Sequence, residues 1–193
     1  MRVLLVDGRR QSVEGTGPAV DTAVDTVAVA EAALAERAHE TTVLSLTGEG
    51  FDRYMSTEER RAYHEADNLV TPAQQRSAEL LRSAEALLVV GAIRGGTIDP
   101  LVKSWFERVF VPGVSFAFTD SGRITRALTH IRRVGMILSC PDGDAAPHRR
   151  GASTRSVLRG VRLNAARSCR STYVALGPAD DVEATVTRAL ARW

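Results

Sequence analysis

The sequence lacks any long apolar run: no hydrophobic stretch approaches the roughly 20 residues that a membrane-spanning helix requires. The first apolar run, Val3 to Val6, is also far too short for the core of a signal peptide. Internal repeats, low-complexity tracts and linker-like segments are missing as well. Together with 44% hydrophobic and 25% charged residues, these absences predict one globular, cytoplasmic domain over residues 1–193, with no membrane association.

Cysteine is scarce, with only Cys140 and Cys169, and neither belongs to a CxxC motif. This speaks against a zinc or dithiol site, so we expect reduced thiols and no metal centre. Cys169 precedes an expected strand and is interpreted as structural. Cys140 follows another expected strand, where it is either a small buried residue or a redox thiol; the first role is the more common one.

Lysine is almost absent, because Lys103 is the only lysine among the 25 basic residues. A preference for arginine codons would explain that choice, but not the clustering of eleven Arg against two Asp in residues 121–170. A basic face of this kind can receive a phosphorylated cofactor or an acidic partner. Aromatic residues do not alternate with the basic ones there, so nucleic acid is not an expected partner.

Five short, mostly apolar runs are present, as is typical of parallel strands that are buried on both faces. They are Arg2–Val6, Thr41–Leu46, Ala86–Val90, Arg133–Leu138 and Thr172–Leu176. Helical segments alternate with them, at about Pro18–Ala38, Pro72–Ser83, Pro100–Val109, Ser153–Ser168 and Ala179–Arg192. This alternation predicts an α/β fold, a doubly wound parallel sheet in strand order 2-1-3-4-5 with helices on both faces.

Several local signals fix the boundaries of the expected elements. Ser56 with Glu59, and Thr71 with Gln74, form the spacing of a capping box. Asp99 followed by Pro100 is a typical helix start. Residues 115–118 alternate in polarity and are expected to pair with residues 123–124 as a short ribbon that presents Phe116 and Phe118 on one face.

Ligands of such a sheet bind at the carboxyl ends of the strands where the strand order reverses, here between the first and third strands. The loop at residues 7–17 enters a helix, so its free N–H groups favour an anion. Arg9, Ser12 and Thr16 would complete a phosphate cradle there, unless the hydroxyls only cap the helix. The loop is neither GxGxxG nor a P-loop, which disfavours a dinucleotide fingerprint or a nucleotide kinase.

The loop at residues 91–99 contains Gly95 and Gly96, which allow the backbone to approach a flat ligand such as a flavin ring closely. Backbone groups of Ile93 to Gly96 would then bind the polar edge of the ring. Arg94 would stabilise negative charge on a reduced flavin or on a substrate. The simpler interpretation is that the glycine pair only makes a tight turn.

The loop at residues 139–151 would bring Ser139 and Cys140 to the same edge. His148 is a candidate proton donor, since an unperturbed histidine titrates near pH 6.5. A lone histidine in a loop is, however, more often simply solvated.

Two blocks of residues resemble the flavodoxin-like NAD(P)H:quinone oxidoreductases, including the modulator of drug activity B branch. Residues 99–113, DPLVKSWFERVFVPG, are similar to the family's helix and ribbon, and Gly122-Arg123-Ile124-Thr125 to its Gly-Arg-x-Thr turn. Residues 50–64 are similar to the excursion that follows the family's second strand. The resemblance implies a flavodoxin-like fold, a homodimer, bound FAD or FMN, and reduction of a quinone or small aromatic substrate by NAD(P)H.

The residues at the expected cofactor site differ from the family's pattern. Arg94-Gly95 replaces an aromatic pair, and Ser139-Cys140-Pro141 replaces Thr-Gly-Gly. A second hypothesis is therefore a chain without flavin that acts as a cyclase, isomerase or dehydratase on an aromatic metabolite, using Arg94, Cys140, Asp142 and His148. A third is a non-catalytic binding partner that uses the basic face.

Overall fold

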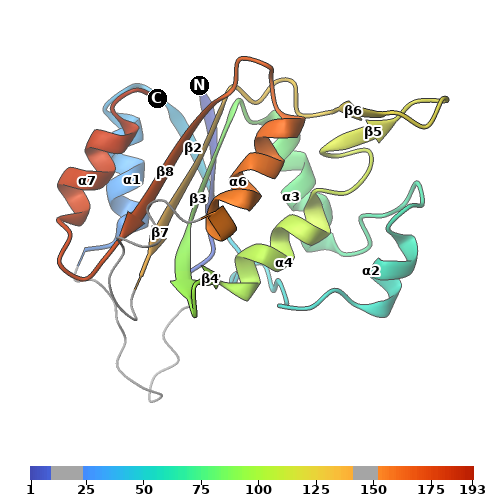
Figure 1. Cartoon of the computed structure of the whole chain (residues 1–193), viewed down its shortest axis with the longest axis horizontal. Coiled ribbons are helices and arrows are strands. Elements are labelled where there is room, and N and C mark those ends of the chain that lie inside the picture. The colour runs from blue at the N-terminus through green and yellow to red at the C-terminus, as the bar shows by residue number, and fades with distance from the viewer. Residues whose placement is uncertain (10–23, 141–151) are drawn as a thin grey trace.

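The protein is built around a parallel sheet in the order β2-β1-β3-β7-β8 (Figure 1). The computed structural model describes residues 1–9, 24–140 and 152–193. The strands are β1 (Arg2–Asp7), β2 (Glu40–Ser45), β3 (Ala86–Arg94), β7 (Arg133–Ser139) and β8 (Arg170–Leu176). These are the five expected strands in chain order, so the predicted order 2-1-3-4-5 is confirmed.

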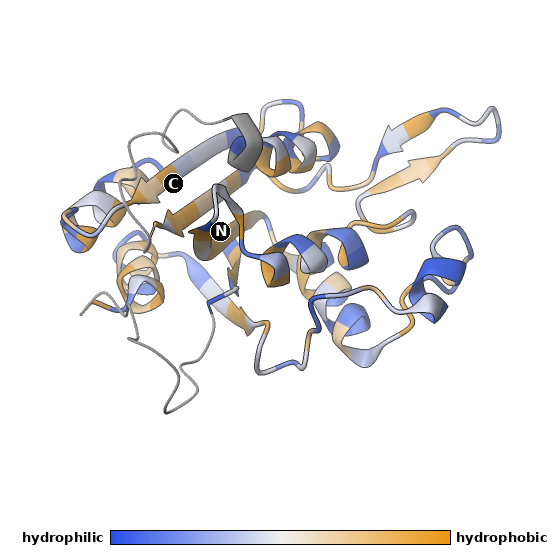
Figure 2. Ribbon diagram, turned by 60° about the horizontal axis from the view of Figure 1, so that its bottom comes forward, coloured by the Kyte–Doolittle hydropathy of each residue, from blue (hydrophilic) through white to orange (hydrophobic). Residues whose placement is uncertain are grey.

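Helices cover both faces of the sheet, and a separate apolar cluster fills each interface. Helices α1 (Thr26–Ala35) and α7 (Val182–Leu190) pack on one face, over Leu5, Leu88 and Ile137. Helices α3 (Pro72–Ser83), α4 (Pro100–Val109) and α6 (Ala152–Asn164) cover the other, over Leu4, Leu87 and Met136. Figure 2 shows the apolar strands of the sheet between helices that carry both polar and apolar residues.

The predicted capping boxes are confirmed. Helix α2 (Thr57–Ala62) begins after Ser56, whose hydroxyl accepts the N–H of Glu59, while the Glu59 carboxylate accepts the N–H of Ser56. Thr71 and Gln74 make the same reciprocal pair at α3, and Asp99 caps α4. No helix among the described residues has the length and hydropathy of a membrane span.

Three helix boundaries were predicted wrongly. Helix α1 begins at Thr26 rather than Pro18, because Asp25 is extended and its carboxylate accepts the N–H groups of Val27 and Ala28. Helix α7 begins at Val182 for the same reason, with Asp181 as its cap. Helix α6 ends at Asn164, where the backbone pairs with Leu128, rather than near residue 168.

Two hairpins extend the fold, and the sequence indicated only one of them. The predicted ribbon is formed by β5 (Phe116–Phe118) and β6 (Ile124–Arg126), which project from the body of the molecule (Figure 1). The unpredicted strand β4 (Thr97–Ile98) turns back and pairs antiparallel with the end of β3. Most aromatic side chains lie elsewhere, in the core: Trp105 is fully buried and contacts Phe106 and Phe110 edge-on.

A candidate active site at the carboxyl edge of the sheet

The residue that follows β1, Gly8, packs closely against helix α4. The Gly8 N–H donates to the carbonyl of Val90 on β3, at 2.9 Å. A Cβ atom on Gly8 would clash with Cγ2 of Val102, and one on Gly91 would lie 3.1 Å from the same methyl group. Glycine at both positions therefore lets α4 pack directly beneath the switch point, where the strand order reverses.

Arg9 is held by two carboxylates at this switch point. Its Nε and Nη2 donate to the two oxygens of Asp7, at 2.9 and 3.0 Å, and its Nη1 donates to Asp25. The hydrogen bonds that Arg9 donates to the Asp7 carboxylate raise the pKa of Arg9, and they outweigh burial, which acts to lower it. Burial also acts to raise the pKa of Asp25, but Arg9 and the capped N–H groups outweigh it, so that this pKa is lowered. Arg9 thus ties the start of α1 to the end of β1, and a phosphate bound here would meet a guanidinium that is already charge-paired.

Gly95 and Gly96 form the two-residue turn between β3 and β4. Arg94 pairs with Thr97 across this turn, and both glycines have positive φ, 54° and 76°. Such a turn favours glycine, because other residues are strained in this conformation. Both glycines are exposed, and no atom lies within 4 Å of the position of an added Cβ at either. The glycine pair makes the tight turn and at the same time presents bare backbone to solvent.

Arg94 is oriented by the first turn of α4. Its Nε lies 3.5 Å from Oδ2 of Asp99, whose side chain is only 2% exposed, whereas that of Arg94 is 45% exposed. Asp99 is fixed in turn, because its Oδ1 accepts the N–H of Leu101 and its own N–H donates to Ala92. The guanidinium therefore has one side anchored to a buried carboxylate and remains half open to solvent.

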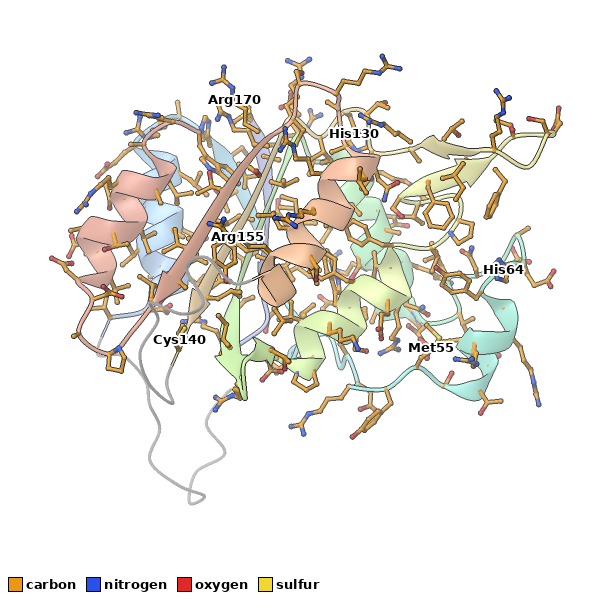
Figure 3. The ribbon with its side chains drawn as sticks, viewed as in Figure 1. Met55, His64, His130, Cys140, Arg155 and Arg170 are labelled. Atoms are coloured by element: carbon orange, nitrogen blue, oxygen red, sulfur yellow. The ribbon has the colours of Figure 1, made fainter. Side chains whose placement is uncertain are left out.

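Strand β7 brings Ser139 and Cys140 to this edge (Figure 3). Ser139 pairs with Ala92 in the sheet, and its hydroxyl donates to the carbonyl of Gly91 at 3.4 Å. Cys140 is 4% exposed and belongs to the apolar core, as expected for a small buried residue. Ile93 is buried as well, with 3% of the residue exposed. Ser12, Thr16 and His148 lie outside the described residues.

A pocket of about 520 Å³ opens beside the glycine turn, between the start of α4 and helix α6. Its walls are mostly apolar or aromatic and also carry two cations and one carboxylate; they include Tyr54, Ile98, Pro100, Val157, Arg53, Lys103 and Glu107. This volume lies within the range of roughly 300–1,000 Å³ that is usual for small-molecule sites. The sequence analysis did not single out these residues as a pocket, and Tyr54 among them is 77% exposed.

Comparison with known proteins places the chain in a family. The sequence model for proteins described as having a flavodoxin-like fold matches residues 1–193. The chain belongs to this family. The match covers the full sequence, so the resemblance inferred from the two blocks of residues is confirmed at the level of the fold. A search of curated proteins gives no significant match.

Solved structures share this fold at low sequence identity. An NAD(P)H:quinone oxidoreductase from Methanothermobacter marburgensis is 20% identical, with a TM-score of 0.69 over 99% of this chain and 93% of its own. An azoreductase from Bacillus anthracis strain Sterne is 15% identical, with a TM-score of 0.65 over 98% and 95%. An FMN-dependent NADH-azoreductase from the Ames Ancestor strain of that species, solved with FMN, is 13% identical, with a TM-score of 0.64 over 99% and 98%.

Proposed function

We propose that this protein is a flavin-dependent oxidoreductase that uses NAD(P)H to reduce a quinone or a related aromatic acceptor. The observation that carries the proposal is the exposed Gly95-Gly96 turn at the carboxyl end of β3, beside a pocket with apolar walls. The names of structures with the same fold, among them a quinone oxidoreductase and an FMN-dependent azoreductase, support it.

The residues present fit a flavin. The polar edge of its ring needs hydrogen-bonding groups that approach closely, and no other atom lies within 4 Å of where a Cβ of Gly95 or Gly96 would be, so a flat ligand can approach the backbone of this turn. Backbone of Ile93 to Gly96 would hold the ring, with Ser139 and the buried Cys140 lining the end of β7. Arg9, Ser12 and Thr16 would hold the phosphate end. When bound, the flavin supplies the transfer of hydride from NAD(P)H and of electrons to the acceptor.

The protein's own side chains have distinct roles in this proposal. Arg94 places positive charge beside the ring site, and Asp99 keeps it oriented at 3.5 Å. The adjoining pocket would receive the aromatic acceptor against Tyr54, Ile98 and Val157, which exclude water from one side of it. His148 would donate a proton to the reduced acceptor.

The two described side chains on which the cofactor-independent hypothesis relied, Arg94 and Cys140, do not support it, and Asp142 and His148 lie outside the described residues. Such an enzyme would need an accessible acid, base or nucleophile at the site. Cys140 is buried in the core, and the accessible Arg94 is charge-paired to Asp99. Arginine is also a poor general base, because its guanidinium stays protonated in proteins.

The test begins with the visible spectrum of the purified protein and calorimetric titration with FMN and with FAD. We expect the absorption band of oxidised flavin in the purified protein, or stoichiometric uptake of one of the two flavins. The loaded protein should then oxidise NADH or NADPH only when a quinone is added. A colourless protein that takes up neither flavin would refute the proposal.

Gly96→Val tests whether the glycine turn contacts the ring. Because Gly96 and Gly122 both lie in hairpin turns with positive φ, 76° and 75°, valine strains the backbone equally at the two positions. We expect Gly96→Val to weaken flavin binding by about tenfold or more, a loss of roughly 1.4 kcal/mol, while Gly122→Val leaves it unchanged. Equal flavin affinity in both variants would mean that the ring is bound elsewhere.

A further inference from the structure

Three arginines lie on one face of helix α6 and point toward the edge strand of the sheet. Arg155, Arg159 and Arg162 are spaced i, i+4 and i+7, which places them on the same side of a helix. Ser171 and Tyr173 alternate along β8 and therefore share the face that α6 covers. All five residues line a pocket of about 260 Å³ between α6 and β8.

Arg155 is held in place by a contact with an aromatic ring, but one of its hydrogen-bond donors has no acceptor. The guanidinium of Arg155 stacks over the ring of Tyr173, with 4.8 Å from Cζ to the ring centroid, and lies between α6 and β8 (Figure 3). Its buried Nε has no hydrogen-bond partner. A buried donor without an acceptor lowers the stability of a protein. The unpaired Nε of Arg155 therefore indicates that a ligand supplies the acceptor.

The pocket is positively charged throughout. Among the described residues, three arginines line it and no carboxylate does. This positive charge also acts on the neighbouring Cys169. Burial raises the pKa of its thiol, and the charges of Arg162 and Arg133 oppose that shift. Arg162 is itself positioned, because its Nε donates to the Cys169 carbonyl at 3.1 Å. The next pocket along β8 also contains Arg155, there together with Arg188 and the carboxylate of Asp180.

We propose that the groove between α6 and β8 is a binding site for a small phosphate-bearing anion, with a diphosphate as its best ligand. Guanidinium groups match phosphate oxygens with paired N–H donors, and Ser171 adds a hydroxyl. The volume of about 260 Å³ is below the usual range for drug-sized ligands and suits a compact anion. Ser171 pairs with Val134 near the amino-terminal ends of β8 and β7, and Tyr173 pairs with Met136 at their centres, so the groove lies away from the carboxyl ends of these strands.

Calorimetric titration with inorganic pyrophosphate and phosphate, at constant ionic strength maintained with chloride, tests this proposal. We expect saturable binding of one pyrophosphate, tighter than phosphate. Arg159→Gln removes an exposed arginine of the pocket that makes no packing contact in the core, and should weaken pyrophosphate binding about tenfold. Arg155→Gln should weaken it at least as much.

Arg37→Gln is the matched control, since Arg37 is exposed, follows α1 and lies on the opposite side of the sheet. It makes the same change in net charge and should leave the affinity for pyrophosphate unchanged. An equal loss in Arg37→Gln and Arg159→Gln, or no binding by the unaltered protein, would overturn the proposal. So would a parallel loss of flavin binding in Arg159→Gln, because the groove would then belong to the site at the carboxyl edge.

Discussion

At the scale of single residues, the most constrained group outside the candidate site is the buried ion pair of Arg108 with Glu59. Their Nε and Oε1 atoms are 2.6 Å apart, and the side chains are 6% and 2% exposed. Arg108 also donates to the Asp52 carbonyl and lies over the ring of Phe51. The pair therefore ties α4 to the excursion after β2, which supplies Tyr54 to the pocket at the carboxyl edge.

Replacing Glu59 with glutamine should destabilise the protein by about 3 kcal/mol, because it leaves the charge of Arg108 buried without a counter-charge. Glutamine has one acceptor oxygen, which can still accept the Ser56 N–H if the amide NH2 faces Arg108, so the loss reports on the ion pair and its hydrogen bond rather than on helix initiation. Urea unfolding followed by circular dichroism measures the difference. Glu58→Gln, an exposed neighbour in the same helical turn, should change the free energy of unfolding by less than about 0.5 kcal/mol.

At the scale of elements, the close approach of α4 to the sheet shapes the candidate site. Gly8 and Gly91 leave room for Val102, and Asp99 at the start of α4 fixes Arg94. The packing of one helix thus sets the positions of two of the loops at the carboxyl edge. A change in the spacing between α4 and the sheet should alter both the free energy of unfolding and the position of Arg94 at the site.

Gly8→Ala should cost about 1–3 kcal/mol of unfolding free energy, since the added methyl clashes with Val102. Val102→Ala should relieve part of that cost, so the double variant should be more stable than the sum of the two single changes predicts. Chemical denaturation of the four proteins in this cycle measures the coupling. Strict additivity of the two changes would show that the clash is absent.

Gly160→Ala is the control for adding a methyl group to glycine. Gly160 lies in α6 with no atom within 4 Å of an added Cβ, so alanine should stabilise the protein by roughly 0.5–1 kcal/mol. The opposite signs of the two Gly→Ala changes would separate a steric effect at Gly8 from the general preference of helices for alanine.

At the scale of the whole molecule, the β5–β6 hairpin stands away from the domain and presents apolar surface. Phe118 pairs with Ile124, and these residues are 51% and 66% exposed, although both are large and hydrophobic. Exposed apolar pairs on a protruding hairpin are typical of an interface. We therefore propose that the protein is a homodimer in which this hairpin contacts the second subunit.

Light scattering coupled to size-exclusion chromatography should give twice the chain mass of 20.8 kDa for the unaltered protein. Ile124→Glu should shift it to the monomer, because it buries a charge in the proposed interface. Val43→Glu introduces the same charge on the exposed part of edge strand β2 and should remain dimeric. A monomeric unaltered protein, or a dimer that survives Ile124→Glu, would contradict this prediction.

The sequence predicted the sheet well, because the central strands β1, β3 and β7 are apolar runs buried on both faces, which leave a strong local signal, whereas the edge strands β2 and β8 are only partly buried. It also predicted the capping boxes at Ser56 and Thr71, which depend only on residues three apart. It misplaced the start of α1 at Pro18, since several polar residues compete as caps and only the bonds of Asp25 to Val27 and Ala28 decide the outcome. It missed β4, a strand of two residues that is too short to carry a periodicity.

The sequence by itself determined a doubly wound parallel sheet, since strands that alternate with helices follow from hydrophobic patterns and chain connectivity, and the resemblance of two blocks of residues indicated the flavodoxin-like family. Only the tertiary structure decided the pairing of Arg9 with Asp7 and Asp25, the anchoring of Arg94 by Asp99, and the arginine-lined groove between α6 and β8. Those contacts join residues from different elements. Their geometry depends on how helices pack on the sheet, which local sequence patterns do not encode.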